Sequence, residues 1–543
     1  MSRKFLVTAT PPTTNGDLHV GHLAGPYLGA DVFKRYQLQR GNEVLYVSSG
    51  DDNQSYVVTT SLRLGRDPRE VITDFAGRIQ ITLKAACIEM DIFTSPDQEH
   101  TLFIQGFFHR LYNAEKIVAK EKDHFFCENC NRFLFESYIN GYCPACFKTT
   151  KGNICESCGN ANDPIDLISP RCSISKNHTI SRKRVKSLFL ELEPLREQFR
   201  DFFDKQRGIW RPHIMQLVFD VLDKPLPDYP ISFISDWGIP VPFPGFEGQV
   251  INVWAEMLPG LMESTRKAAM KHSPKVSVSD LWNAENGYEL VQFLGFDNSF
   301  FFAIVHIALL MTSQEEWILP SAIITNEFYQ LENYKFSTSK NHVIWGVDLL
   351  EKFPVDQVRY YLCLTNPEHQ QTNFLIEEFI RITDEKLSKP WNQLLSQYNH
   401  LVYETTDFSE SELAYISYVL TDKLEVFAHL MESAYEIKSI SLRKAAETLT
   451  NWICWLSDHI SETEASGLVE STNKISKYRA AAAYQGLRAL AIFSEPIMPQ
   501  FSTRLREALN MEHNHWEGYR ENRNITLNKL PDKLLFAELS KNL

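Results

Sequence analysis

The sequence predicts an α/β protein with a doubly wound parallel sheet, an inserted cysteine-rich module and a helical C-terminal part. Three observations support this fold class. Strand-like apolar runs alternate with helical periodicity near the N-terminus, seven of the ten cysteines lie between Cys127 and Cys172, and three-and-four apolar spacing dominates beyond Leu375. The 543 residues exceed one ordinary core. A prior of roughly 150 residues per domain suggests three or four domains.

The N-terminal part begins with a strand over Lys4–Thr10, enters a helix from about Val20 to Arg40, and returns in a strand over Val44–Ser48. Strands that alternate with helices form parallel sheets, and ligands bind beyond the carboxyl ends of those strands. The loop PPTTNGDLHVGH (Pro11–His22) and the acidic pair after the second strand both fall at that edge. Taken alone, the loop is equally consistent with a plain strand–loop–helix join.

Composition and charge limit the class of protein. Hydrophobic residues make up 44% and charged residues 23%, which is typical of a globular chain. The apolar run Phe300–Met311 is shorter than the ~20 residues that span a bilayer, so we expect a buried helix there. The start lacks a signal-peptide pattern, and we expect a soluble, cytoplasmic protein. A net charge of −13 argues against indiscriminate nucleic-acid binding.

The clustered cysteines predict metal binding rather than disulfides. Cys143, Cys146, Cys155 and Cys158 form CxxC-x8-CxxC, four thiolates suited to a closed, structural Zn²⁺ site. A second group is incomplete at the level of the sequence. Cys127, Cys130 and Cys172 supply three ligands, the position expected for the fourth is Ser175, and His178 offers an alternative at unusual spacing. We therefore expect one structural zinc and a partly filled or empty second site.

Several motifs occur together in a characteristic order. After the first strand comes His19-Val20-Gly21-His22, and far downstream lies KFSTSK (Lys335–Lys340); between and after them stand DWGIPVPF, NVWAEM, QFLGFD and VRYYL. This series resembles the class I aminoacyl-tRNA synthetases, and specifically the methionyl-tRNA synthetase family, over nearly the whole chain. The resemblance implies a class I synthetase-type Rossmann catalytic domain with a zinc-knuckle insertion and a C-terminal α-helical bundle.

The resemblance also assigns an ATP site. His19 and His22 correspond to the histidines that contact the phosphates, and Gly21 to the glycine that lets the backbone approach the adenine. Asp297 corresponds to the carboxylate near the ribose. Lys335 begins the family's mobile loop, which also implies ATP contacts from Ser337 and Ser339. The loop's usual second lysine is replaced by Thr338, and we expect Lys340 to supply that charge, with Mg²⁺ accompanying ATP.

The implied amino-acid pocket departs from the family pattern. Asp52 matches the residue that holds the substrate's amino group, and Trp254 matches an aromatic wall. Other pocket positions carry different side chains from those of the family: Pro11, Thr13, Leu261, Asn298, Phe302 and His306. Thr13 and Leu261 stand where the family has a tyrosine, so we expect lost aromatic contacts and a gain of volume. The family's Ile-Ser-Arg-Asp arginine falls at Phe233. Buried polar groups select strongly against ligands that cannot pair with them, so the amino acid is expected to differ from methionine.

The helical part departs as well. Asn392 matches a residue that reads the anticodon, but its arginine partner is replaced by Ser396, and no tryptophan lies between Lys474 and Arg488. Pro390 interrupts the pattern of the helix that carries Asn392. Stacking on such a tryptophan contributes ~1–3 kcal/mol per base. We expect weak or no anticodon readout.

These features leave three hypotheses open. The chain is an ATP-dependent, AMP-forming aminoacyl-tRNA ligase, a paralogue that passes the aminoacyl group to a small molecule, peptide or carrier, or an inactive binding module. The intact ATP motifs favour the first two. The expected partners are ATP, an amino acid and tRNA, without a membrane, and we expect a monomer. The segments are 1–115 and 231–330 for the two catalytic halves, 116–230 for the insertion, 331–380 for the loop and stem-contact region, and 381–543 for the anticodon-binding-like bundle.

Overall fold

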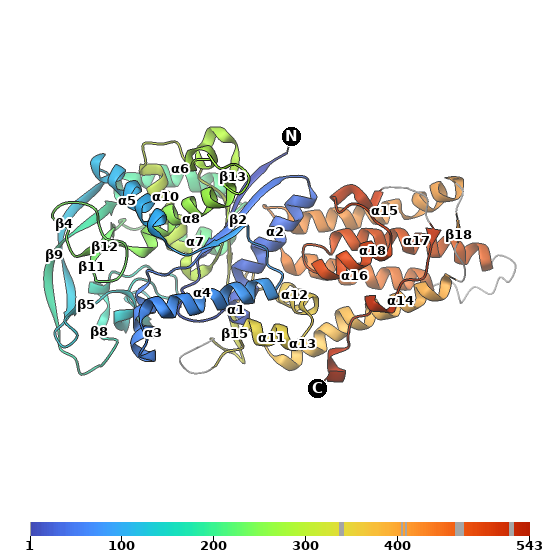
Figure 1. The fold of residues 1–543 in the computed structure, drawn as a ribbon, viewed down its shortest axis with the longest axis horizontal. Helices are drawn as coiled ribbons and strands as arrows, with labels where there is room; N and C mark the ends of the chain where they lie inside the picture. Colours follow the sequence, from blue (N-terminus) through green and yellow to red (C-terminus); the bar gives the residue numbers. More distant parts are fainter. Residues whose placement is uncertain are drawn as a thin grey trace.

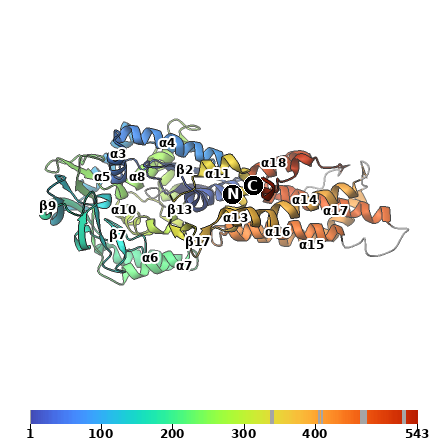
Figure 2. The same ribbon diagram turned by 90° about the horizontal axis from the view of Figure 1, so that it is seen from below.

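The computed structural model describes residues 2–335, 342–402, 406–407, 410–461, 472–520 and 526–542. The chain forms an elongated molecule with two parts, visible in both views (Figures 1 and 2). Residues up to about 350 build the α/β part with its insertion. The orange and red helices extend away from it as a bundle.

A five-stranded parallel sheet lies at the centre of the α/β part, in the order β14-β13-β1-β2-β3. Its strands are β1 (Lys4–Ala9), β2 (Glu43–Ser49), β3 (Ile92–Thr94), β13 (Tyr288–Gly295) and β14 (Pro320–Asn326). The strand order reverses between β1 and β13, and such a switch point opens a crevice at the carboxyl ends of the strands. The predicted doubly wound sheet is confirmed.

The helix predicted from Val20 to Arg40 is confirmed, with an irregular second turn. It consists of α1 (Val20–His22), the π-helical η1 (Leu23–Tyr27) and α2 (Leu28–Gln39). Gly25 departs from helical geometry with ψ −123°, directly before Pro26, which has no N–H to donate. The remaining helices of this part are α3 (Ser55–Leu64), α4 (Pro68–Ala85), α5 (Gln98–Asn113), α8 (Val253–Ala269), α9 (Val278–Trp282), η7 (Phe301–His306) and α10 (Ile307–Thr312).

The insertion carries its own antiparallel sheets. β4 (Ile117–Cys127) and β9 (Ile180–Glu191) pair along their whole length, flanked by β5 (Arg132–Phe133) and β10 (Asp228–Pro230). A smaller sheet contains β6 (Ile139–Tyr142), β7 (Thr149–Lys151) and β8 (Ile168–Cys172). Helices α6 (Arg196–Gln206) and α7 (Pro212–Leu222) lead back toward the central sheet by way of β10 and the two-stranded sheet of β11 (Ser232–Ile234) and β12 (Gln249–Ile251).

Beyond the central sheet the chain becomes helical, as predicted. A three-stranded sheet of β15 (Tyr329–Leu331), β16 (Tyr334–Lys335) and β17 (Thr372–Phe374) precedes the bundle. The helices are α11 (Gly346–Lys352), α12 (Val355–Leu364), α13 (Ile376–Thr383), η9 (Asp384–Ser388), α14 (Lys389–Leu401), α15 (Glu410–Tyr435), α16 (Leu442–Ser461), α17 (Thr472–Phe493) and α18 (Pro499–Ala508). Pro390 lies in the first turn of α14, where a proline is tolerated, and the π-helical η9 leads directly into that turn. The proline therefore does not end the helix that carries Asn392.

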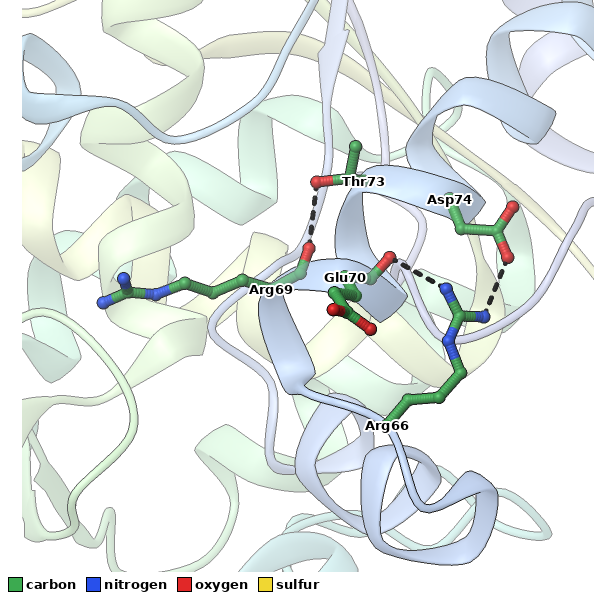
Figure 3. A pocket seen from close by; sticks show the side chains of 5 residues that line it. All are labelled: Arg66, Arg69, Glu70, Thr73 and Asp74. Carbon is green, nitrogen blue, oxygen red and sulfur yellow. Dashed lines mark hydrogen bonds and ion pairs between the residues drawn. The ribbon is translucent and has the colours of Figure 1, made fainter.

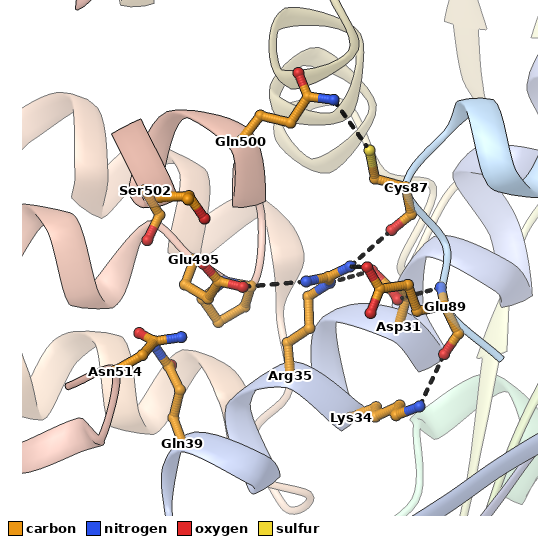
Figure 4. A network of polar contacts seen from close by, with 12 residues as sticks. Asp31, Lys34, Arg35, Gln39, Cys87, Glu89, Glu495, Gln500, Ser502 and Asn514 are labelled. Carbon is orange, nitrogen blue, oxygen red and sulfur yellow. Dashed lines mark hydrogen bonds and ion pairs between the residues drawn. The ribbon is translucent and has the colours of Figure 1, made fainter. Parts of the chain in front are cut away.

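Buried charges join the two parts of the molecule. Asp31 on α2 binds Arg35 (2.9 Å) and Arg359 on α12 (2.8 Å), and Arg35 also reaches Glu495 before α18 (3.1 Å; Figure 4). Burial opposes ionisation of Asp31, but Arg359 and Arg35 hold its pKa below the usual value. Since α2 follows the His19–His22 loop by way of α1 and η1, this network attaches the helix behind that loop to the bundle.

The run of basic residues on β9 is largely engaged with neighbouring side chains. Lys183 lies over the Phe126 ring at 3.1 Å, and Arg184 lies 3.3 Å from Glu121. Within the ranges described above, none of the helices combines the length and apolar character needed to cross a lipid bilayer.

Candidate active site

The loop after β1 is fixed to the end of β2 at the switch point of the sheet. Asp51 N–H donates to Pro12 O at 2.9 Å, and the hydroxyl of Thr13 donates to the Asp51 carboxylate at 3.2 Å. The Thr14 hydroxyl donates to Asp52 at 2.7 Å. The sequence prediction that Pro11–His22 and the acidic pair share one edge is therefore confirmed in geometry.

His19 and His22 cap the start of the helix reciprocally. The His22 N–H lies 3.3 Å from His19 Nδ1, the His19 N–H lies 3.2 Å from His22 Nδ1, and the two rings stack at 3.7 Å. Because each Nδ1 accepts, each neutral imidazole carries its proton on Nε2. The two rings thus lie at the N-terminal end of a helix with their protons on Nε2, and a helix N-terminus favours an anion such as phosphate.

The loop predicted to carry the second ATP motif falls mostly outside the described residues. Ser337, Ser339 and Lys340 lie there, and Lys335 is described only as backbone in β16. The chain beyond the loop returns to the histidines. Val20 N–H donates to Ile344 O at 3.0 Å, and Gly346 N–H donates to Leu18 O at 2.8 Å. The segment Ile344–Gly346, which follows the second motif, therefore lies beside the His19–His22 loop, more than 300 residues away in the sequence.

Asp297 lies in a short turn directly after β13, across the switch point from the loop. The Asn298 amide donates to the Asp297 carboxylate at 3.0 Å and so orients it. Gly295 allows this turn, because a Cβ there would stand 2.7 Å from Asp297 Oδ1. Asn298 consequently serves its neighbour, and its predicted contact with the amino acid stays a prediction.

Four buried carboxyl groups gather beside the crevice: Asp51, Asp52, Glu136 and Glu256. Burial raises the pKa of Asp52 to about 6, of Glu136 to about 7 and of Glu256 to about 8, and raises that of Asp51 well above its usual value. The sequence analysis assigned a role only to Asp52. The signal that was available for Glu256 is a charged residue inside the apolar helix segment that begins at Asn252.

The wall of the predicted amino-acid pocket is densely packed. Trp254 stacks on Phe301 at 3.9 Å, and its backbone carbonyl lies 2.8 Å from His306 Nε2. His306 is buried, which lowers its pKa to about 4, and therefore stays neutral. Its ring also contacts Phe302 at 4.5 Å, and Leu261 is fully buried on α8. The structure thus brings Trp254, Phe302 and His306 together.

The cavity beside this pocket provides little of the expected volume. The cavity that Pro11 lines measures about 10 Å³, room for about one water molecule. Its walls also include Asp51, His100, Glu256 and Met257.

A wider surface depression lies away from this crevice. It is open to solvent and is lined by residues at the start of α4: Arg66, Arg69, Glu70, Thr73 and Asp74 (Figure 3). Within this depression Arg66 forms an ion pair with Asp74 at 3.0 Å. No sequence-predicted site residue lines this depression, and we assign it no role in the reaction.

Two groups of side chains in the insertion are arranged to hold a metal ion. One consists of Cys143, Cys146, Cys155 and Cys158, and the other of Cys127, Cys130, Cys172 and His178; within each group the ligand atoms lie within 4.8 Å of one another. A tetrahedral zinc with bonds of about 2.3 Å places sulfurs about 3.8 Å apart. The Cys143–Cys158 and Cys130–Cys172 sulfur atoms lie 3.8 Å apart.

His178 corrects the expectation that the second group lacks a ligand. Its Nδ1 lies 3.3 Å from Cys130 Sγ and 3.6 Å from Cys127 Sγ. The fourth ligand is thus supplied six residues after Cys172, past Ser175, because the turn between β8 and β9 brings His178 back toward Cys127. Both groups therefore fit zinc equally well in ligand number and spacing.

The predicted anticodon contact at Asn392 is occupied within the protein. Its amide donates to Phe536 O at 2.9 Å and accepts from Phe536 N–H at 3.0 Å. Both polar atoms of the side chain therefore hold the C-terminal segment against α14. The contact of Asn392 with tRNA stays a prediction.

Comparisons with known proteins identify the family. The profile described as "tRNA synthetases class I (M)" matches residues 5–398. A methionine–tRNA ligase of Thermomicrobium roseum is 33% identical over 386 residues, which cover 71% of this chain and 66% of that protein, slightly under two thirds of its length. "Methionine–tRNA ligase 2" of Bacillus cereus is 29% identical over 519 residues, 93% of this chain and 92% of its own.

The fold is shared with solved structures. The chain of Mycobacterium tuberculosis methionyl-tRNA synthetase in complex with methionyl-adenylate superposes with a TM-score of 0.74 at 18% identity, covering 97% of this chain and 98% of the other. The chain thus belongs to the class I aminoacyl-tRNA synthetases of the methionyl-tRNA synthetase type, a family of ATP-dependent aminoacyl-tRNA ligases.

Proposed function

We propose that the chain activates an α-amino acid with ATP to an aminoacyl-adenylate and transfers the aminoacyl group to tRNA. The observation that carries this proposal is the placement of His19 and His22 after β1 and of Asp297 after β13, on the two sides of the switch point of the sheet. In this chemistry the amino acid's carboxylate attacks the α-phosphorus and pyrophosphate leaves, so negative charge develops on phosphate oxygens. Nε2–H groups of His19 and His22 would stabilise that charge, with Mg²⁺ bound to ATP.

The remaining roles follow from position. We infer that Asp52 receives the substrate's ammonium group, because it is buried at the carboxyl end of β2 and Thr14 satisfies one of its oxygens. Lys335 and Lys340 at the ends of the loop segment would add positive charge near the leaving pyrophosphate. Gly21, Ser337 and Ser339 remain proposed ATP contacts. Transfer to a non-tRNA acceptor is the second candidate, favoured by the engagement of Asn392 and by Ser396.

ATP–pyrophosphate exchange across a panel of amino acids tests the activation step. Loss of a buried aromatic contact costs on the order of 3 kcal/mol, so methionine is expected to bind roughly a hundredfold more weakly than in a methionyl-tRNA synthetase with the family's usual pocket. We therefore expect a better substrate than methionine in the panel. Aminoacylation of tRNA transcripts with altered anticodons tests the acceptor, and the rate is expected to be insensitive to the change. Efficient methionine charging that collapses without a CAU anticodon would contradict both expectations.

Metal analysis tests the two cysteine groups. We expect two zinc ions per chain, because each group supplies four ligands at tetrahedral spacing. His178→Ala is expected to reduce the content to about one, with Cys143–Cys158 still loaded. A wild-type content of one would show that the Cys127 group stays empty, and a content of zero would overturn both sites.

A further inference from the structure

The small cavity beside the crevice is lined by acidic groups from separate elements. Asp51 follows β2, Glu256 lies on α8, and His100 lies on α5. Gly260 makes room for the His100 ring, since a Cβ there would stand 2.9 Å from Cε1. Pro11, one of the predicted pocket residues, closes the same cavity. It therefore adjoins the region where the amino-acid side chain is expected.

One oxygen in this cavity wall has no hydrogen-bond partner. Glu256 is only 5% exposed; its Oε1 accepts from the Asn53 amide at 2.6 Å, but its Oε2 is buried without a partner. A buried acceptor left unpaired is costly, and most native structures satisfy such atoms. Glu256 thus presents an acceptor that a ligand's donor would satisfy.

The positive charge that would balance these carboxyl groups is missing from the described part of the chain. None of the ion pairs found there includes Asp51, Asp52, Glu136 or Glu256. At Phe233, where the family carries an arginine, the ring stacks on Phe135 at 4.6 Å instead. Lys267, which acts on His100, is itself bound to Asp97 at 2.6 Å.

We propose that the site activates an α-amino acid whose side chain ends in a primary ammonium group, bound between Asp51 and Glu256. The substrate class includes 2,4-diaminobutyrate, ornithine and lysine. The cavity has room for about one water molecule, which matches an ammonium group and is too small for a guanidinium. This inference rests on the adenylation proposed above. In it Asp52 binds the α-ammonium group of the substrate, and Asp51 and Glu256 bind the side-chain ammonium group.

A neutral, buried His100 completes the environment. Burial lowers its pKa to about 4, so its ring stays uncharged and does not repel a cation. Burial also raises the pKa of Glu256 to about 8, so an ammonium ligand would favour the carboxylate form and release a proton on binding. A thioether side chain offers neither a donor to Glu256 nor a charge for the pair.

The test compares diamino acids with neutral analogues of similar length. In ATP–pyrophosphate exchange with the full chain, ornithine or its homologues are expected to exceed norleucine and methionine in kcat/KM by about tenfold or more, the effect of a charge-assisted hydrogen bond. Glu256→Gln keeps the side chain's size and the Asn53 contact but removes the charge. It is expected to lower exchange with ornithine by about tenfold or more and to leave that with norleucine nearly unchanged.

Further variants and measurements make the outcomes separable. Glu70→Gln on the exposed start of α4 is expected to change the exchange rate with neither ornithine nor norleucine. Calorimetric measurement of ornithine binding without ATP gives a readout that is independent of catalysis. Circular dichroism establishes that Glu256→Gln is folded, and Asp51→Asn provides a second variant. Exchange with norleucine or methionine equal to that with the diamino acids would overturn this inference while the adenylation stands. No exchange with any amino acid would overturn both.

Discussion

Alanine at His19 or His22 is expected to slow adenylate formation by roughly 10²–10³-fold, the usual loss when one preorganised donor to transition-state charge is removed. The physical reason is that each ring's Nδ1 accepts from the backbone of the other histidine, so Nε2 carries the proton that a phosphate oxygen would accept in the complex with ATP. The measurement is ATP–pyrophosphate exchange with the best amino acid of the panel, at saturating ATP.

A structural effect of the same substitution is separable. His19 also caps the helix, and loss of a cap costs about 1 kcal/mol of stability. His19→Asn retains a short side-chain acceptor for the His22 N–H but has no equivalent of Nε2–H. If the role is phosphate binding, the Asn variant stays as slow as the Ala variant. Recovery of activity in the Asn variant would show that His19 acts only as a cap.

Arg359→Met is expected to lower the free energy of unfolding by about 3–5 kcal/mol, since it removes one partner of a buried ion pair. Arg359 is 1% exposed and donates to Asp31 and to the carbonyls of Pro496, Ile497 and Ala86. The loss would remove one of the two arginine partners of Asp31 and the hydrogen bonds to these three carbonyls. Urea unfolding followed by tryptophan fluorescence measures the effect.

The matched control is Arg381→Met. Arg381 pairs with Glu378 and Glu385 on the exposed face of its helix and is half exposed, so its loss is expected to cost far less stability than the loss of Arg359. A similar decrease in the free energy of unfolding for the two variants would show that the buried ion pair of Arg359 stabilises the fold no more than an exposed one. Asp31 has a lowered pKa in the folded protein, so its contribution is present above about pH 4 and is lost as the pH falls through the folded value.

Residues close in sequence were sufficient to predict the main elements. The alternation of apolar runs and helical periodicity over the first 50 residues predicts the parallel sheet, because local periods of two and 3.6 decide between strand and helix. The spacing of Cys143, Cys146, Cys155 and Cys158 predicts a metal site because the ligands are close along the chain. The fourth ligand of the second group is different. The spacing left Ser175 and His178 as alternatives, and the turn between β8 and β9 places His178 beside the cysteines.

The sequence by itself determined the family and predicted its ATP motifs and the first group of four cysteine ligands, since each depends on short segments whose chemistry and order are visible in the chain. Only the tertiary structure decided that Asn392 holds the C-terminal segment and that Met257 lines a water-sized cavity. The tertiary structure also decided that Asp51, Glu136 and Glu256 gather beside Asp52. These residues lie as much as 205 positions apart, from Asp51 to Glu256, and a carboxyl group's burial and partners are set by the elements that pack around it, which no local pattern encodes.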